Sequence, residues 1–200
     1  KAALHVVVEN ENYEILKLLL SSSKINPNIQ MILTAQQKHF KKTALHISIE
    51  KNNFEMVKLL LTCKKLDVNI KLSDYYYDCD NREENETDKS ALDLAVEIGN
   101  PQIIKLLLSC DSLDVNQISV YLNNGIFNIT ETKSSAFHSA IESENLEIIQ
   151  LFLSCKRIDI NQKYEYIYSL KNCDFIPDKI IVKTALHISI EKENIEIIKL

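Results

Sequence analysis

The apolar positions of this chain fall into pairs of short blocks that return every 41 to 49 residues. Each pair opens on Ala-Leu-His or a close variant, and a second block of the type Ile-Ile-Lys-Leu-Leu-Leu follows eleven or twelve residues later. The first blocks begin at five alanines, Ala3, Ala44, Ala91, Ala136 and Ala185. Residues 42–51 and 183–192 have the identical sequence KTALHISIEK, so the chain is built from copies of one unit.

Each unit is predicted to contain two short helices. A hydroxyl residue that can cap a first helical turn precedes four of the five alanines; these residues are Thr43, Ser90, Ser135 and Thr184. The second block is apolar over most of a helix's circumference, so neighbouring units must cover it on both sides. Residues 99–101 (GNP) mark the turn between the two helices. The other units have Glu or Asn in place of Gly99, which costs about 1 kcal/mol if the turn requires positive φ.

The second unit resembles the ankyrin repeat, a helix-turn-helix unit followed by a finger-like loop. Residues 43–52 (TALHISIEKN) match part of the family core TPLHxAAxxG, and residues 57–61 (VKLLL) and 67–69 (DVN) match its second half. The resemblance extends over the whole chain. The family unit has about 33 residues, so these units carry about 8 to 16 extra residues before the next alanine.

We therefore expect an all-α fold, an ankyrin-type helix-turn-helix solenoid of about five repeats with elongated finger loops. Residues 1–200 are expected to form a single array, with repeats starting near residues 2, 43, 90, 135 and 184. Terminal repeats normally carry a polar outer face, and neither end shows one, which suggests a fragment of a longer array. Within the inserts, the alternation of residues 164–168 (YEYIY) predicts a strand of a hairpin, and Asn124-Gly125 predicts a tight hairpin turn.

Composition narrows the class of protein. Hydrophobic residues make up 46% of the chain, enough for a continuous core between stacked units. No uninterrupted apolar segment reaches the roughly 18 residues of a membrane span, and no N-terminal signal is visible. The cysteines number five, and none form a Cys-x-x-Cys pair, which disfavours disulfides and zinc sites. We expect reduced thiols and a cytoplasmic location, with a nuclear location as the alternative.

Four histidines share one position of the repeat, and Asp93 takes that position in the third unit. Stacked helices lie roughly 8 to 10 Å apart, too far for neighbouring rings to share a metal ion. The resemblance implies instead that this His hydrogen-bonds the backbone of a neighbouring unit. The sequence has no motif for nucleophilic, phosphate-binding or metalloprotease chemistry. We therefore expect no enzyme activity, no cofactor and no metal site.

The inserts between units carry the candidate binding residues. Residues 74–88 contain seven acids and one Arg, a net charge of −6 in a chain of −5, which leaves +1 elsewhere and disfavours nucleic-acid binding. Tyrosines beside this charge are typical interface residues; the finger is either merely solvated or binds a basic protein segment. The candidate partner-binding residues are Tyr75, Tyr76, Tyr77, Asp78 and Asp80 in this insert, and Tyr121, Phe127, Tyr164, Tyr166 and Tyr168 in the two later inserts.

The function expected from these features is protein binding by an adaptor or scaffold, through concave helix faces and finger loops. The alternative is a regulatory or substrate-recruiting segment of a larger multidomain protein such as a ligase, a kinase or a channel. We expect a monomer whose partners are chosen by residues 70–89, 117–134 and 162–183. Neither nucleic acid nor a membrane is an expected partner.

Overall fold

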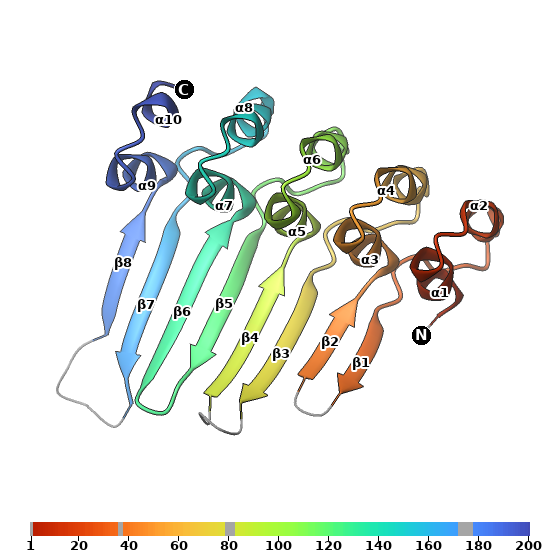
Figure 1. Ribbon diagram of the computed structural model, residues 1–200, viewed down its shortest axis with the longest axis horizontal. Helices are drawn as coiled ribbons and strands as arrows, with labels where there is room; N and C mark the ends of the chain where they lie inside the picture. The colour runs from red at the N-terminus through yellow and green to blue at the C-terminus, as the bar shows by residue number, and fades with distance from the viewer. Residues whose placement is uncertain (1, 36–37, 79–82, 172–177) are drawn as a thin grey trace.

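The computed structural model describes residues 2–35, 38–78, 83–171 and 178–200, which form ten helices and eight strands (Figure 1). The inner helices, which lie next to the strands, are α1 (Ala3–Glu9), α3 (Ala44–Glu50), α5 (Ala91–Ile98), α7 (Ala136–Glu142) and α9 (Ala185–Glu191). The outer helices are α2 (Tyr13–Ser21), α4 (Phe54–Leu61), α6 (Pro101–Leu108), α8 (Leu146–Ser154) and α10 (Ile195–Lys199). Each repeat contributes one inner and one outer helix, and the repeats stack side by side.

Polar caps determine where the helices begin. Ser90 Oγ accepts a hydrogen bond of 3.0 Å from the N–H of Asp93, as the hydroxyl pattern predicts. Every outer helix follows an Asn whose side chain accepts from the first turn, as Asn53 does from the N–H of Met56 at 3.1 Å. The asparagines therefore add a second start signal to the repeat.

The turn between the two helices of each repeat has positive φ. Gly99 lies at 74° and Glu144 at 57°, and the corresponding residues of the other repeats lie at 54°. The condition under which a non-glycine residue costs about 1 kcal/mol at this turn is therefore met in four repeats. Glu144 gains a contact there, because its carboxylate lies 3.5 Å from Lys192 Nζ in the next repeat.

The hydrophobic core runs as one continuous cluster along the stack. Met56, Ile103 and Phe152, from three successive outer helices, are fully buried. Outer helices within the stack are thus covered by their own inner helix and by the helices of adjacent repeats, as their mostly apolar circumference predicts. At the two ends of the described stack, Leu18 of α2 and Ile195 of α10 remain exposed.

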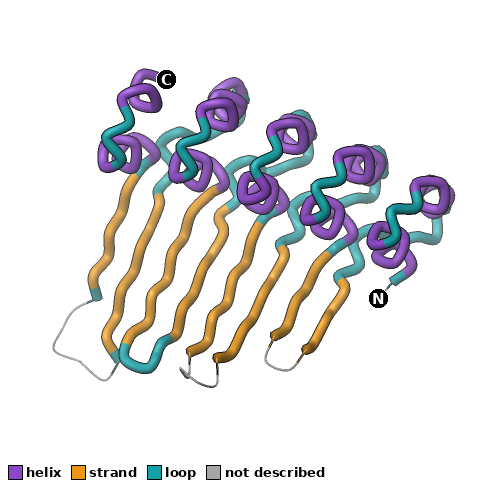
Figure 2. Tube along the Cα trace, in the orientation of Figure 1, coloured by secondary structure: helices purple, strands orange, loops and turns teal. Residues whose placement is uncertain are grey.

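The inserts form a β-sheet, which makes the prediction of an all-α fold wrong. The strands are β1 (Met31–Ala35), β2 (Lys38–Lys42), β3 (Leu72–Asp78), β4 (Glu83–Lys89), β5 (Ile118–Asn124), β6 (Asn128–Ser135), β7 (Tyr164–Leu170) and β8 (Lys179–Lys183). They pair in chain order as one antiparallel sheet, which extends from the row of inner helices (Figure 2). The ankyrin-type helix pairs are present, but each finger is a β-hairpin that is hydrogen-bonded to the next hairpin.

Most strands were not predicted from the sequence because they are stabilised by hydrogen bonds to strands of other repeats. An isolated two-stranded hairpin is marginal in water, and the β4 sequence EENETDK has little preference for strand. In the sheet, however, β4 is paired on both sides, and its Thr87 lies opposite Asp74 of β3 and Tyr121 of β5. Strand formation therefore depends on partners in other repeats. The predicted strand at residues 164–168 is confirmed as part of a hairpin. A hairpin also forms after Asn124, but its turn is not the predicted tight Asn-Gly turn, because β5 ends at Asn124 and β6 begins only at Asn128.

Candidate functional site

The two faces of the sheet carry different side chains. Directly opposed residues of paired strands point to the same side, so the register assigns every residue to a face. We call one the inner face; it holds Tyr76, Tyr121, Tyr164, Tyr166 and Tyr168. The other is the outer face; it holds Tyr75, Tyr77, Glu84, Glu86, Asp88, Glu131 and Glu165.

Lysines at the ends of strands join the inner face to the inner helices. Three of them pair with a glutamate near the C-terminal end of the following helix: Lys42–Glu50 at 2.5 Å, Lys89–Glu97 at 2.7 Å and Lys183–Glu191 at 2.5 Å. The inner helices and the inner face therefore form one continuous surface. The recurring spacing of eight residues between Lys and Glu is the sequence signal that could have located this junction.

The tyrosines of the two later inserts gather on this surface. Tyr121 lies opposite Thr132, which in turn lies opposite Tyr166. The Tyr164 ring is centred 6.0 Å from the ring of His138 on α7. These rings are half-buried, so each presents an apolar surface and a hydroxyl group together. Four of the predicted partner-binding residues in the later inserts thus share one surface, and the fifth, Phe127, lies at a hairpin turn with 77% of its surface exposed.

The tyrosines of the first acidic insert, in contrast, are divided between the faces. Tyr75 and Tyr77 lie on the outer face, whereas Tyr76 lies on the inner face under Lys38 Nζ, 4.8 Å from its ring centroid. The backbone of Asp78 ends β3, and Asp80 lies outside the described residues. The sequence therefore predicted these tyrosines as candidate binding residues, but it did not predict that they lie on opposite faces of a sheet.

Of the acidic residues of this insert whose side chains the structure describes, three lie on the outer face and Asp74 lies on the inner face. Glu84, Glu86 and Asp88 lie on the outer face of β4. The hairpin is not a free-standing finger, because β2 and β5 flank it on either side. The described acidic side chains of β4 are therefore separate from the inner-face tyrosines, whereas Asp74 of β3 shares a face with Tyr76.

A cavity of about 340 Å³ lies where the inner face meets α5 and α7. Its lining residues are Glu97, Tyr121, Thr132, Ser134, Ser139, Glu142 and Tyr164. Burial, with the nearby carboxylates of Asp93 and Glu97, raises the pKa of Tyr121. Burial likewise raises the pKa of Tyr164. Both phenols are therefore uncharged hydroxyl groups at neutral pH.

The recurring histidines have a structural role. His138 Nδ1 accepts from the N–H of Ser135 at 3.1 Å, so its Nε2 carries the proton and donates to the carbonyl of Gln162 at 2.9 Å. Gln162 belongs to the same repeat, which corrects the expectation of a bond to a neighbouring unit. Burial lowers the pKa of His46 to about 4, so this ring is neutral as well.

Asp93 replaces the histidine in the third repeat and is accommodated by two serines. Its Oδ2 accepts from Ser119 Oγ at 2.5 Å and from the backbone N–H of Ser90 at 3.2 Å. Burial raises the pKa of the Asp93 carboxyl group, against these hydrogen bonds. The residue is buried beneath the surface and exposes no atom for chemistry.

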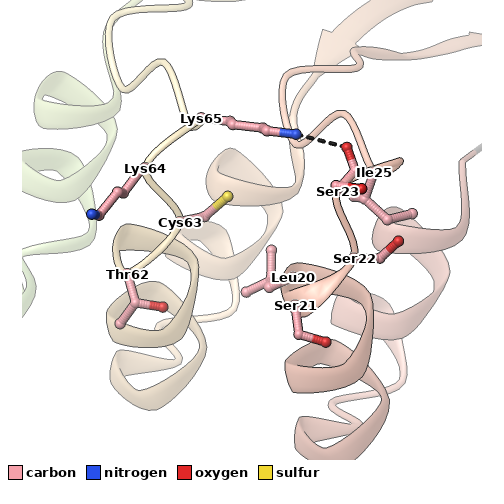
Figure 3. Close-up of a pocket in the computed structure, with 9 residues that line it drawn as sticks. All are labelled: Leu20, Ser21, Ser22, Ser23, Ile25, Thr62, Cys63, Lys64 and Lys65. Carbon is pink, nitrogen blue, oxygen red and sulfur yellow. Dashed lines mark hydrogen bonds between the residues drawn. The ribbon is translucent and has the colours of Figure 1, made fainter.

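A second cavity, of about 310 Å³, lies between the first two repeats at the ends of α2 and α4 (Figure 3). Lys65 reaches across it to donate to the carbonyl of Ser23 at 2.7 Å, and Cys63 lines it with a free thiol. In the fourth repeat, the equivalent Arg157 makes four such bonds, to carbonyls of the preceding repeat. This cavity is thus a loosely filled contact between repeats.

Within the described ranges, no group of three or more His, Cys, Asp and Glu side chains is arranged to hold a metal ion. In the same part of the chain, none of the helices has the length and apolar character needed to cross a membrane.

A family model described as ankyrin repeats (3 copies) matches residues 1–74 and 72–164. Among curated protein sequences there is no match. The crystal structure of the ankyrin repeat domain of Bcl-3, described as a unique member of the IkappaB protein family, is similar with a TM-score of 0.56. The match has 16% sequence identity and covers 100% of this chain and 69% of that chain, so it concerns the fold alone.

Proposed function

The chain belongs to the ankyrin repeat family, and we propose that it is a protein-binding module of the adaptor or scaffold type. Ankyrin repeats are generally protein–protein interaction modules. The binding surface that we propose consists of the inner face of the sheet and the adjoining inner helices. The observation that carries the proposal is the gathering of five half-buried tyrosines on that face, two of which, Tyr121 and Tyr164, lie beside α5 and α7.

Tyrosine suits such a surface for physical reasons. Its ring offers a large apolar contact area, few rotatable bonds are lost on binding, and its hydroxyl can hydrogen-bond a partner. The surface is also held in shape before binding, because every hairpin is hydrogen-bonded to its neighbours. A preformed surface loses less conformational entropy on binding than separate flexible loops would lose.

Residues 70–89, 117–134 and 162–183 would act together in this proposal, because they are parts of one sheet. Partner choice then depends on the combination of hairpins. We propose that residues 1–200 are one array and that the module acts as a monomer in the cytoplasm or nucleus. A regulatory or substrate-recruiting segment of a larger ligase, kinase or channel would use the same surface.

Paired variants test which face binds. The inner-face variant combines Tyr76→Ser, Tyr166→Ser and Tyr168→Ser; the matched outer-face control combines Tyr75→Ser, Tyr77→Ser and Ile167→Ser. Affinity capture from cell extract, quantified by mass spectrometry, should show that partners of the wild-type chain are lost from the inner-face variant and kept by the control. Circular dichroism checks that both variants fold. Retention by the inner-face variant, or loss only from the control, would refute the proposed surface.

A further inference from the structure

The fourth repeat lacks a lysine that the other repeats have. The glutamate near the end of each inner helix is preceded, eight residues earlier, by Lys1, Lys42, Lys89 and Lys183 in four repeats and by Ser134 in the fourth. In the described pairs, this lysine contacts the glutamate directly. Glu142 of the fourth repeat therefore has no lysine from its own repeat.

The place of the missing lysine is a cavity. Ser134 and Glu142 both line the 340 Å³ cavity at the junction of the inner face with α5 and α7. In the described part of the chain, the Glu142 carboxylate makes no hydrogen bond or ion pair, and its side chain is exposed. The lysines of the adjacent repeats, Lys89 and Lys183, are already paired with their own glutamates.

We propose that this cavity receives one lysine or arginine side chain of a protein partner, carried on a basic segment that binds along the junction of the inner face and the inner helices. The Glu142 carboxylate would make a charge-assisted hydrogen bond to the cation, which is among the stronger hydrogen bonds in proteins. The hydroxyl groups of Thr132 and Ser139 supply further acceptors. This inference rests on the proposed function and names the partner chemistry of one position on the same surface.

The aromatic walls favour a cation as well. Lys89 Nζ lies over the Tyr121 ring, 5.5 Å from its centroid, so the chain itself already places an ammonium group against this ring. Tyr164 provides a second ring on the other side of β6, which lies between the strands of Tyr121 and Tyr164. An anionic side chain would instead meet the carboxylate of Glu142, which repels it, whereas the charge of Glu97 is balanced by Lys89.

The direct test is to restore the missing lysine. Ser134→Lys should place an ammonium group beside Glu142, as in the other repeats, and fill the cavity from within while the fold is kept. Glu142→Gln removes the charge but keeps the shape. Glu147→Gln, at an exposed position on α8, is the control for a change of net charge alone.

The probe is a phage-displayed library of random dodecapeptides, selected on the wild-type chain; the selected peptides are then synthesised and titrated by fluorescence anisotropy. We expect a recurring Lys or Arg at one peptide position. Ser134→Lys and Glu142→Gln should each weaken binding by about tenfold, whereas Glu147→Gln should leave it unchanged. Replacing the recurring basic residue by norleucine should cost as much as Glu142→Gln.

Three results would overturn the inference, and they differ in what they say of the proposed function. Selected peptides without a recurring basic residue, or with one whose binding survives both cavity variants, refute the cavity as a cation site and leave a protein-binding surface in place. Equal weakening by Glu147→Gln reduces the effect to net charge and refutes the site as well. Selection of no peptide on the folded wild-type chain counts against both the cavity and the proposed function.

Discussion

The side-chain oxygen of Asn69 accepts a hydrogen bond of 2.7 Å from the backbone N–H of Asp114, which lies in the next repeat. The Asn69 amide nitrogen donates to the carbonyl of Ser112 at 2.8 Å, so one side chain holds two backbone groups of its neighbour. Asn28 and Asn116 make the same pair of bonds one repeat before and one repeat after. These asparagines therefore link each of the first three repeats to the backbone of the next.

Replacing Asn69 by Ala is expected to weaken the contact between the second and third repeats. Two hydrogen bonds are lost, each worth about 1 kcal/mol, so the free energy of unfolding should fall by about 2 kcal/mol. Urea denaturation followed by circular dichroism measures the change. Asn161→Ala is the matched control, because Asn161 occupies the same repeat position and its side chain makes no such bond in the described structure. Equal destabilisation by the two variants would contradict this role.

His46 should make stability depend on pH in the acidic range. Burial lowers the folded-state pKa from 6.5 to about 4, so the unfolded chain takes up the proton first. The contribution of neutral His46 to the free energy of unfolding is complete above pH 6.5 and is lost as the pH falls through the folded-state pKa. The free energy of unfolding should fall by roughly 3 kcal/mol in total over this range. His46→Gln keeps a helix-start residue at this position but removes the titration. Urea denaturation from pH 7 to 4 should show a smaller loss for the variant, and parallel curves for the two proteins would contradict the assignment.

The positive-φ turns provide a pair of opposite substitutions. Gly99→Ala meets no atom within 4 Å of the added Cβ, so its cost comes from the backbone at φ 74° and should be about 1 kcal/mol. Glu193→Gly removes a side chain from φ 54° and should stabilise the last repeat by up to about 1 kcal/mol. Native-state hydrogen exchange resolves both effects by repeat. A stabilising Gly99→Ala would show that the turn is not strained.

The helices could be predicted from sequence because their signals are local. The hydroxyl residue before four of the five first blocks, the apolar spacing and the GNP turn of the third repeat are each contained within one repeat. The sheet could not be predicted in the same way, since a strand such as β4 (Glu83–Lys89) has few strand-forming residues and is stabilised by β3 and β5. Only β7 (Tyr164–Leu170) alternates clearly enough to be recognised alone.

The candidate site could likewise be predicted only as far as its signals are local in the sequence. Its tyrosines were named from the inserts, but their grouping depends on strand register, which separates Tyr75 and Tyr77 from Tyr76. The cavity at Glu142 depends on the absence of a lysine at Ser134, and comparison of the repeats at a spacing of eight residues shows this absence. Two of its lining residues, however, are Tyr121 and Tyr164 on strands of different repeats, which only the three-dimensional structure brings together.

The measurement that tests the binding surface most directly is site-specific photo-crosslinking at two adjacent residues of β7. Tyr166 lies on the inner face and Ile167 on the outer face, so a benzoylphenylalanine at either position samples a different side of the same strand. With partners captured by the wild-type chain, we expect crosslinks from position 166 and few or none from position 167. Crosslinks that arise mainly from position 167, or equally from both, would contradict the proposed inner-face binding surface.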